Sequence, residues 1–195
     1  MKKSLFSTAL LVLAGLATFA QVKWSADPAH TSIGFSVKHL GINYVQGHFA
    51  KFTGAIETTD STSFQNAKVD FSADVNSIST GVEQRDGHLK TDDFFNAAEF
   101  SEIKVKSVSF KKVAGSKYVM LADVTIRNTT KRVAFDVNYN GVVRDPWGLW
   151  RAGFTAKATI NRFDFGVKYA DKLPSGVYAV APTVEILVNA EIVKQ

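Results

Sequence analysis

The longest alternating pattern in this chain is Val184-Glu185-Ile186-Leu187-Val188-Asn189-Ala190-Glu191-Ile192, close to the C-terminus. Apolar residues occupy every second position, and all but one of the intervening residues are polar. Successive side chains of a β-strand point to opposite faces. The segment therefore predicts a long strand with one buried face.

The same alternation recurs along most of the chain, in residues 32–38, 69–75, 103–110, 133–139 and 154–160. Residues 44–57 and 118–127 alternate less regularly and are also predicted to be extended. In 44–57, Phe49 and Phe52 fall on opposite parities, which predicts a bulge near Gly47 or Gly54. About eight strands with hairpin-length connections favour an antiparallel sandwich or closed barrel.

Two segments interrupt the alternation. Residues 83–100 contain few β-branched residues, and we predict one or two short helices capped near Thr80 and Thr91. Residues 161–180 are rich in Gly, Pro and Asp and predict a long loop, which is often a functional lid or mouth.

The N-terminal residues have the composition of a leader. Lys2 and Lys3 precede a short apolar stretch that ends in Ala17-Thr18-Phe19-Ala20. This pattern predicts a secretory signal peptide over residues 1–20, one domain over residues 21–195, and a periplasmic or secreted location. The apolar stretch is shorter than the ~20 residues of a membrane-spanning helix, so we expect no stable membrane insertion.

Composition excludes several classes of protein. The chain has 195 residues, of which 46% are hydrophobic, and this is ordinary for a globular domain. It has no cysteine, which excludes disulfides, thiolate metal sites and a cysteine nucleophile. Its net charge of +5 is spread along the chain, so no nucleic-acid partner is expected.

Catalytic and metal-binding motifs are not found in the sequence. There is no Gly-x-Ser-x-Gly elbow and no phosphate-binding loop, so we expect no enzyme and no cofactor. His30 and His39 are nine positions apart on one predicted strand, roughly 30 Å if extended, and cannot share a metal. We therefore predict no metal site, and a composite site such as His39 with His88 stays open as the alternative.

The strongest polar cluster is Arg85, Asp86 and His88, beside Phe94 and Phe95. It can form a polar mouth for a lipid head group, since the guanidinium suits phosphate. Equally, an Arg–Asp pair can fasten the helix to the barrel.

The same alternatives apply to Arg162 and Asp164. His39 ends its strand and lies either at the rim of the barrel or against the backbone. Small and aromatic residues alternate in the predicted interior, which leaves open a cavity for a long apolar guest or a filled core.

Four motifs, in order along the chain, resemble the YceI-like family. They are His30-Thr31-Ser32-Ile33-Gly34-Phe35-Ser36-Val37-Lys38-His39-Leu40-Gly41, then Arg85-Asp86-Gly87-His88-Leu89-Lys90 with Asp93-Phe94-Phe95-Asn96, then Thr125-Ile126 with Thr130-Lys131, and Ile160-Asn161-Arg162-Phe163-Asp164-Phe165-Gly166. Asn128-Thr129 and Ser101 depart from the family's usual turn glycine and proline.

The resemblance implies an all-β, lipocalin-like antiparallel barrel of about eight strands with a short helical insert and a lipid-binding tunnel. It also implies non-catalytic binding, storage or transport of a long amphiphilic lipid, such as a polyisoprenoid, an isoprenoid quinone or a fatty-acid derivative. A homodimer is compatible with it, and the oligomeric state stays open. An enzyme acting on a lipid inside the barrel and a small outer-membrane barrel are the alternative functions.

On this basis we predict a ligand-binding surface made of inward apolar side chains and a polar rim. The predicted residues are Phe35, Val37, His39, Phe49, Phe71, Ala73, Arg85, His88, Phe94, Phe95, Phe135, Phe154, Ala156 and Ala158.

Overall fold

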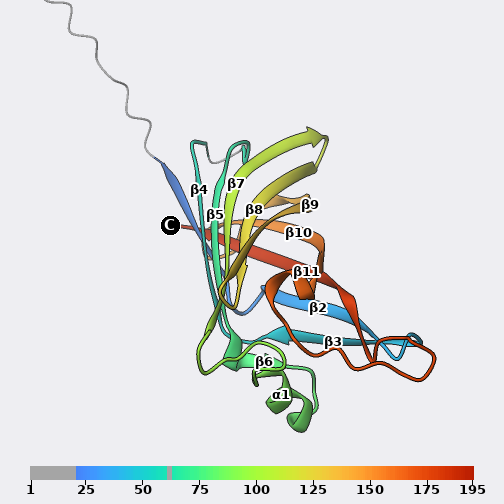
Figure 1. The fold of residues 1–195 in the computed structure, drawn as a ribbon. Helices are drawn as coiled ribbons and strands as arrows, with labels where there is room; N and C mark the ends of the chain where they lie inside the picture. Colours follow the sequence, from blue (N-terminus) through green and yellow to red (C-terminus); the bar gives the residue numbers. More distant parts are fainter. Residues whose placement is uncertain (1–20, 61–62) are drawn as a thin grey trace, which may run out of the picture.

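The computed structural model describes residues 21–60 and 63–195, in which eleven strands form one antiparallel sheet (Figure 1). The strands are β1 (Val22–Ala26), β2 (Ser32–His39), β3 (Asn43–Phe49), β4 (Phe52–Thr58), β5 (Lys68–Asp74), β6 (Ile78–Ser79), β7 (Glu102–Ala114), β8 (Lys117–Ile126), β9 (Thr129–Arg144), β10 (Trp150–Asn161) and β11 (Val180–Lys194). The helical elements are η1 (Val75–Ser77), α1 (Glu83–Leu89) and η2 (Arg162–Phe165). The predicted signal peptide lies outside the described residues.

Eight of the strands close into a barrel. Their order is β1-β4-β5-β7-β8-β9-β10-β11, and β1 returns to β11 through the pairs Trp24–Lys194 and Ala26–Ile192. This confirms the predicted all-β, lipocalin-like barrel with a short helix. The strand predicted from residues 184–192 is β11, on which the closure depends.

Strand β11 has two different neighbours along its second edge. Its last residues pair with β1, whereas Val180–Asn189 pairs with β2. Strands β2, β3 and β6 therefore extend the sheet beyond the barrel, and we call these three strands the flap. Figure 1 shows the flap leaving the barrel, with α1 next to β6.

The predicted bulge near Gly47 or Gly54 is wrong. Residues 44–57 are two strands, β3 in the flap and β4 in the barrel, separated at Ala50–Lys51. The registers of β2–β3 and β4–β5 are continuous through both glycines. The change of parity arises because the chain breaks between the strands, so that Phe49 and Phe52 both pack in the same hydrophobic cluster.

The predicted helical segment contains one helix, α1, followed by turns up to Phe100. Its N-cap is Val82, and no helix begins at Thr91. No helix in the described part of the chain is both long and apolar enough to cross a membrane. The predicted long loop after Asn161 begins with the single turn of η2 and continues to β11.

The buried side chains form two clusters. The larger fills the barrel and includes Trp24, Phe64 and Phe154. The smaller lies beneath the flap and consists of Phe49, Ala73 and Ile78, with Phe35 and other partly buried residues packed on it.

Candidate ligand-binding cavity

A cavity of about 220 Å³ is lined by members of both clusters. Nearly all of its lining residues are apolar, and the two polar exceptions are Ser72 and Arg162. The lining includes residues of the barrel strands, of β2 and β3 in the flap, and of the turns after α1. Such a surface offers burial to a hydrocarbon chain but few hydrogen bonds.

Ten residues of the predicted surface line this cavity. They are Phe35, Val37, Phe49, Phe71, Ala73, Phe94, Phe95, Phe135, Phe154 and Ala156. Ala158 is buried on the same strand as Ala156 but is not among the lining residues, nor are His39, Arg85 and His88. Ligand binding by the predicted residues, whether they line the cavity or not, stays a prediction.

Aromatic side chains pack at the end of the barrel where β1 meets β11. Phe64, from the loop between β4 and β5, lies 5.5 Å from Trp24, 5.4 Å from Tyr139 and 4.8 Å from Phe154, measured between ring centroids. Trp24 and Phe64 are each 1% exposed. We call these four residues the aromatic plug, because they fill this end of the interior.

Arg85 fastens α1 to the chain that follows β6. Its Nε donates to Thr80 Oγ1 at 2.7 Å and its Nη2 to the Thr80 carbonyl oxygen at 2.9 Å. The Asp86 carboxylate accepts from the Thr80 amide at 2.8 Å. Arg85 and Asp86 thus both bond to Thr80 and do not pair with each other. They fasten the helix, as one of the two alternatives predicted, but through Thr80 and not through an Arg–Asp ion pair.

His88 lies outside the cavity but touches a residue that lines it. Its Nε2 is 2.8 Å from Asp93 Oδ2, and its ring meets the edges of Phe94 and Tyr169. Phe94 in turn stacks on Tyr169 with centroids 5.1 Å apart. His39 is exposed at the end of β2, in register with Asn43 and Val180.

Arg162 is the charged residue that the structure adds to the predicted surface. It is 5% exposed, and its Nε and Nη2 donate to the carbonyl oxygens of Ala181 at 3.0 Å and Val180 at 2.8 Å. Its Nη1 is buried without a hydrogen-bond partner. Burial lowers the pKa of this guanidinium. The suspected partner Asp164 is exposed and forms no ion pair with it.

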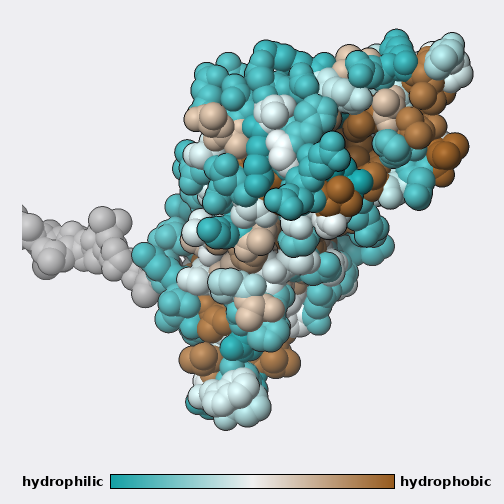
Figure 2. Space-filling view, turned by 90° about the horizontal axis from the view of Figure 1, so that it is seen from below, coloured by the Kyte–Doolittle hydropathy of each residue, from teal (hydrophilic) through white to brown (hydrophobic). Residues whose placement is uncertain are grey.

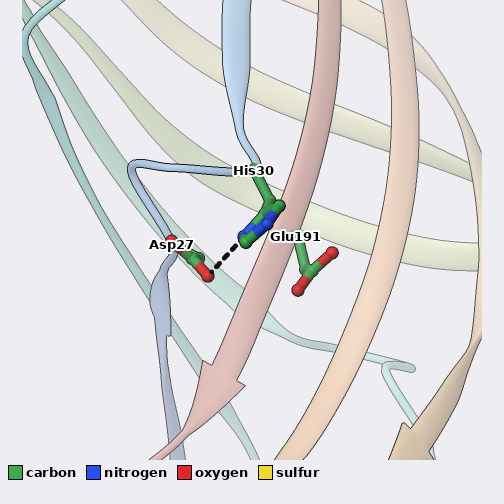
Figure 3. Close-up of side chains that lie close together, drawn as sticks. All are labelled: Asp27, His30 and Glu191. Atoms are coloured by element: carbon green, nitrogen blue, oxygen red, sulfur yellow. Dashed lines mark hydrogen bonds and ion pairs between the residues drawn. The ribbon is translucent and has the colours of Figure 1, made fainter. Parts of the chain in front are cut away.

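A second polar cluster lies at the other end of β10, where Asp27, His30 and Glu191 come together (Figure 3). Their possible ligand atoms lie within 4.8 Å of one another, but Arg151 Nη1 donates to Asp27 Oδ2 and Glu191 Oε1, both at 2.6 Å. Arg151 Nε also donates to Asp145 Oδ2 at 2.7 Å. The guanidinium pairs with all three carboxylates, so the cluster is an ion-pair network that ties together the β1–β2, β9–β10 and β11 segments.

The network shifts the pKa values of its members. The hydrogen bond from His30, followed by that from Arg151, lowers the pKa of Asp27 to about 2. The same Asp27 contact raises the pKa of His30 above 6.5. Hydrogen bonds to the carboxylates of Asp145, Asp27 and Glu191 raise the pKa of Arg151 above its ordinary value.

Hydrophobic side chains are exposed where the flap ends. Ile42 is 84% exposed at the β2–β3 turn, and Tyr44 and Val177 are about half exposed. The turn contacts the loop before β11, since Leu40 donates to the Ala179 carbonyl. Figure 2 shows a hydrophobic area at this projecting end and smaller hydrophobic areas at the opposite end of the same face. Val37 and Val180, which line the cavity, pair with Val45 and His39 near this end of the flap.

The fold and cavity together define a class: a small closed β-barrel with an apolar interior that can hold a guest. Comparison with known proteins then identifies the family. The YceI-like domain profile matches residues 24–192, and the chain belongs to the YceI-like family.

Similar sequences and solved structures are consistent with membership of the YceI-like family. A UPF0312 protein of Photorhabdus laumondii is 35% identical over 187 residues, covering 96% of this chain and 93% of the relative. The crystal structure of a Campylobacter jejuni YceI protein is similar with a TM-score of 0.69 and 27% identity, covering 87% of this chain and 96% of the other. A polyisoprenoid binding domain from Saccharophagus degradans shares the fold, with a TM-score of 0.64 and 14% identity, covering 88% of this chain and 98% of the other.

Proposed function

We propose that this protein binds, stores or carries a long amphiphilic lipid in its barrel and does not convert it chemically. A polyisoprenoid, an isoprenoid quinone and a fatty-acid derivative all have the required shape. The single observation that carries the proposal is the apolar cavity that extends from the aromatic plug to Arg162. The Saccharophagus degradans domain, which has the same fold, is described as polyisoprenoid binding, and this supports the proposal.

Apolar burial supplies enough free energy for such a guest. Each buried CH₂ group contributes ~0.8 kcal/mol, so a chain of about a dozen carbons contributes roughly 10 kcal/mol. Association costs an estimated 4–15 kcal/mol in lost freedom. A micromolar Kd requires a net gain of about 8.2 kcal/mol, so roughly 15–30 buried CH₂ groups are needed, which is the length of a long lipid chain. Binding of this kind depends weakly on salt.

The alternatives fit the structure less well. In β7–β9 the charged residues Lys106, Asp123 and Arg132 face solvent, while Phe110, Val124 and Phe135 face inward. An outer-membrane barrel has the opposite arrangement. An enzyme that acts on a bound lipid would release a product of changed mass, whereas a carrier would return the lipid unchanged.

The test is mass spectrometry of lipid extracted from the protein purified from its own host. We expect one class of long-chain amphiphile, retained in about equimolar amount and unchanged after prolonged incubation with the pure protein. Protein that repeatedly purifies without lipid, and binds no added long-chain lipid, contradicts the proposal. A chemically altered lipid points to an enzyme.

We also propose a periplasmic or secreted location, on the basis of the signal-peptide pattern in residues 1–20. Fractionation of cells and N-terminal sequencing test this. A mature protein that begins near Gln21 in the periplasmic extract is the expected result, and an intact N-terminus in the cytoplasm contradicts it.

A further inference from the structure

Among the described residues, Arg162 is the only charged residue whose backbone and side chain together are buried. It follows β10 directly, at the start of η2, and lines the apolar cavity together with its neighbours Ile160 and Val167. A guanidinium in such a place loses most of its hydration, which is costly unless its hydrogen bonds and its charge are both compensated.

The hydrogen bonds are compensated only in part. Nε and Nη2 donate to two carbonyl oxygens at the start of β11, and the guanidinium carbon lies 4.3 Å from the centroid of the Phe163 ring. These contacts fix the orientation of the side chain. They leave Nη1 buried with no acceptor.

The charge is not compensated by any carboxylate. The ion pairs formed within residues 21–60 and 63–195 do not include Arg162. The ionisable groups that act on it are two phenols, Tyr169 and Tyr178. Burial raises the pKa of Tyr169, which keeps this phenol neutral near neutral pH. In contrast Arg127, whose side chain is 7% exposed, lies 2.6 Å from the Asp92 carboxylate.

We propose that Arg162 is the receptor for the acidic head group of the lipid: Nη1 donates to one carboxylate or phosphate oxygen, while the tail lies along the apolar wall. The guest supplies the negative charge that the fold does not. A neutral carbonyl or hydroxyl head would accept a hydrogen bond but would leave the charge unpaired, so it binds less tightly. The inference rests on the proposed function and specifies the ligand class of the same cavity.

The test uses two fluorescent lipids that differ only in the head: cis-parinaric acid and its methyl ester. Each is titrated into delipidated wild-type protein and into Arg162→Lys, Arg162→Met and Arg85→Met. Arg85→Met is the matched control, because Arg85 also donates to a backbone carbonyl but lies outside the cavity. Thermal unfolding of each variant is followed in parallel.

We expect wild-type protein to bind the acid roughly tenfold to a hundredfold more tightly than the ester, which corresponds to one hydrogen bond to a charged group. Arg162→Met should lose this preference by weakening the acid alone, Arg162→Lys should keep part of it, and Arg85→Met should keep all of it. A simple alkyl phosphate of equal chain length, used as a competitor of the fluorescent acid, shows whether the site prefers a phosphate or a carboxylate head group.

Equal binding of acid and ester by the wild type overturns the inference and leaves the proposed function intact. A preference that persists in folded Arg162→Met also overturns it. Failure of both lipids to bind the wild type contradicts the proposed function itself. Because the wild-type ratio of acid to ester is decisive without any variant, a substitution that prevents folding does not obstruct the test.

Discussion

Two arginines flank strand β10, Arg151 near its start and Arg162 directly after its end, and they have opposite surroundings. Arg151, on the outer face near the aromatic plug, donates to the carboxylates of Asp27, Asp145 and Glu191. Arg162, on the cavity near the flap, donates to two backbone carbonyls and is paired with no described carboxylate. Accordingly the pKa of Arg151 is raised and that of Arg162 is lowered.

This difference separates a structural end of the barrel from the end at which we propose that the lipid head binds. A guanidinium whose charge is matched by the protein holds segments together, and it has no charge left for a guest. A guanidinium that is buried without a counter-charge is retained at a cost in stability, and that cost is offset only when a ligand brings an anion. The comparison predicts which substitutions affect stability and which affect binding.

The largest effect is expected at the structural end, from Trp24→Ala. Trp24 is 1% exposed in the aromatic plug, and loss of such a side chain typically costs 3–5 kcal/mol of unfolding free energy. Urea unfolding measures it, with Trp147→Ala as control, because Trp147 is 81% exposed and its loss should cost under ~0.5 kcal/mol. A change in the acid-to-ester ratio of folded Trp24→Ala would break the separation of the two ends.

Between the two ends, Ala156→Trp should abolish binding without preventing folding. Ala156 is partly buried and lines the cavity, so an indole there fills the space of the lipid tail. We expect at least a ~100-fold loss of affinity for cis-parinaric acid, or about 2.7 kcal/mol. Ala134→Trp is the control, since Ala134 is exposed on β9. Undiminished binding by Ala156→Trp would place the tail elsewhere.

At the flap, Gly47→Ala should cost roughly 1–3 kcal/mol of unfolding free energy by overpacking. A Cβ at Gly47 would lie 2.4 Å from Phe35 Cζ and 2.9 Å from Thr80 Cγ2, so the Phe35 ring must move within the cavity. Gly87→Ala in α1 meets nothing within 4 Å and should instead stabilise by ~0.5–1 kcal/mol. Chemical denaturation of both variants checks this, and equal effects would contradict the close approach.

The smallest effect is a pH dependence at the Arg151 end. The carboxylates of Asp27 and Glu191 raise the pKa of His30 above its ordinary 6.5, whereas Arg151 opposes the shift. Protonated His30 therefore stabilises the fold below pH 6.5, and this contribution is lost as the pH rises through the raised folded pKa.

The melting temperature of the wild type should thus fall slightly as the pH rises from about 6.5 through the raised pKa of His30, and His30→Asn should reduce this fall. Identical pH profiles for the two proteins would remove His30 from the network. Asp27 acts at acid pH, because its pKa is lowered from 3.8 to about 2. Its ionised carboxylate stabilises the fold above pH 3.8, and this contribution is lost as the pH falls towards 2.

The sequence predicted the barrel because alternation depends only on which faces of a strand are buried. The period-two segment at residues 184–192 became the strand that completes the closure. The break at Ala50–Lys51 was missed, since a change of parity between Phe49 and Phe52 is equally compatible with a bulge and with two strands. Only the flap, which takes β3 away from β4, distinguishes them.

The polar end of the site was harder to predict. Arg85 has more polar neighbours in the sequence than Arg162 has. However, both of its hydrogen bonds are to Thr80, and Arg85 does not line the cavity. In the sequence Arg162 and Asp164 are two positions apart and equally polar, and nothing in it shows that η2 turns Arg162 inward and Asp164 to solvent. The sequence shows only that Arg162 follows the alternating residues 154–160 and precedes Phe163 and Phe165. Its burial depends on contacts with β11, which is separated from it by the long loop.

The most direct measurement is a crystal structure of the protein purified from its own host with its lipid in place. We expect a tail against Phe154 and Ala156 and an acidic oxygen of the head within hydrogen-bond distance of Arg162 Nη1. A lipid that lies outside the barrel, or one whose head points to the aromatic plug and leaves Arg162 Nη1 without an acceptor, would contradict it.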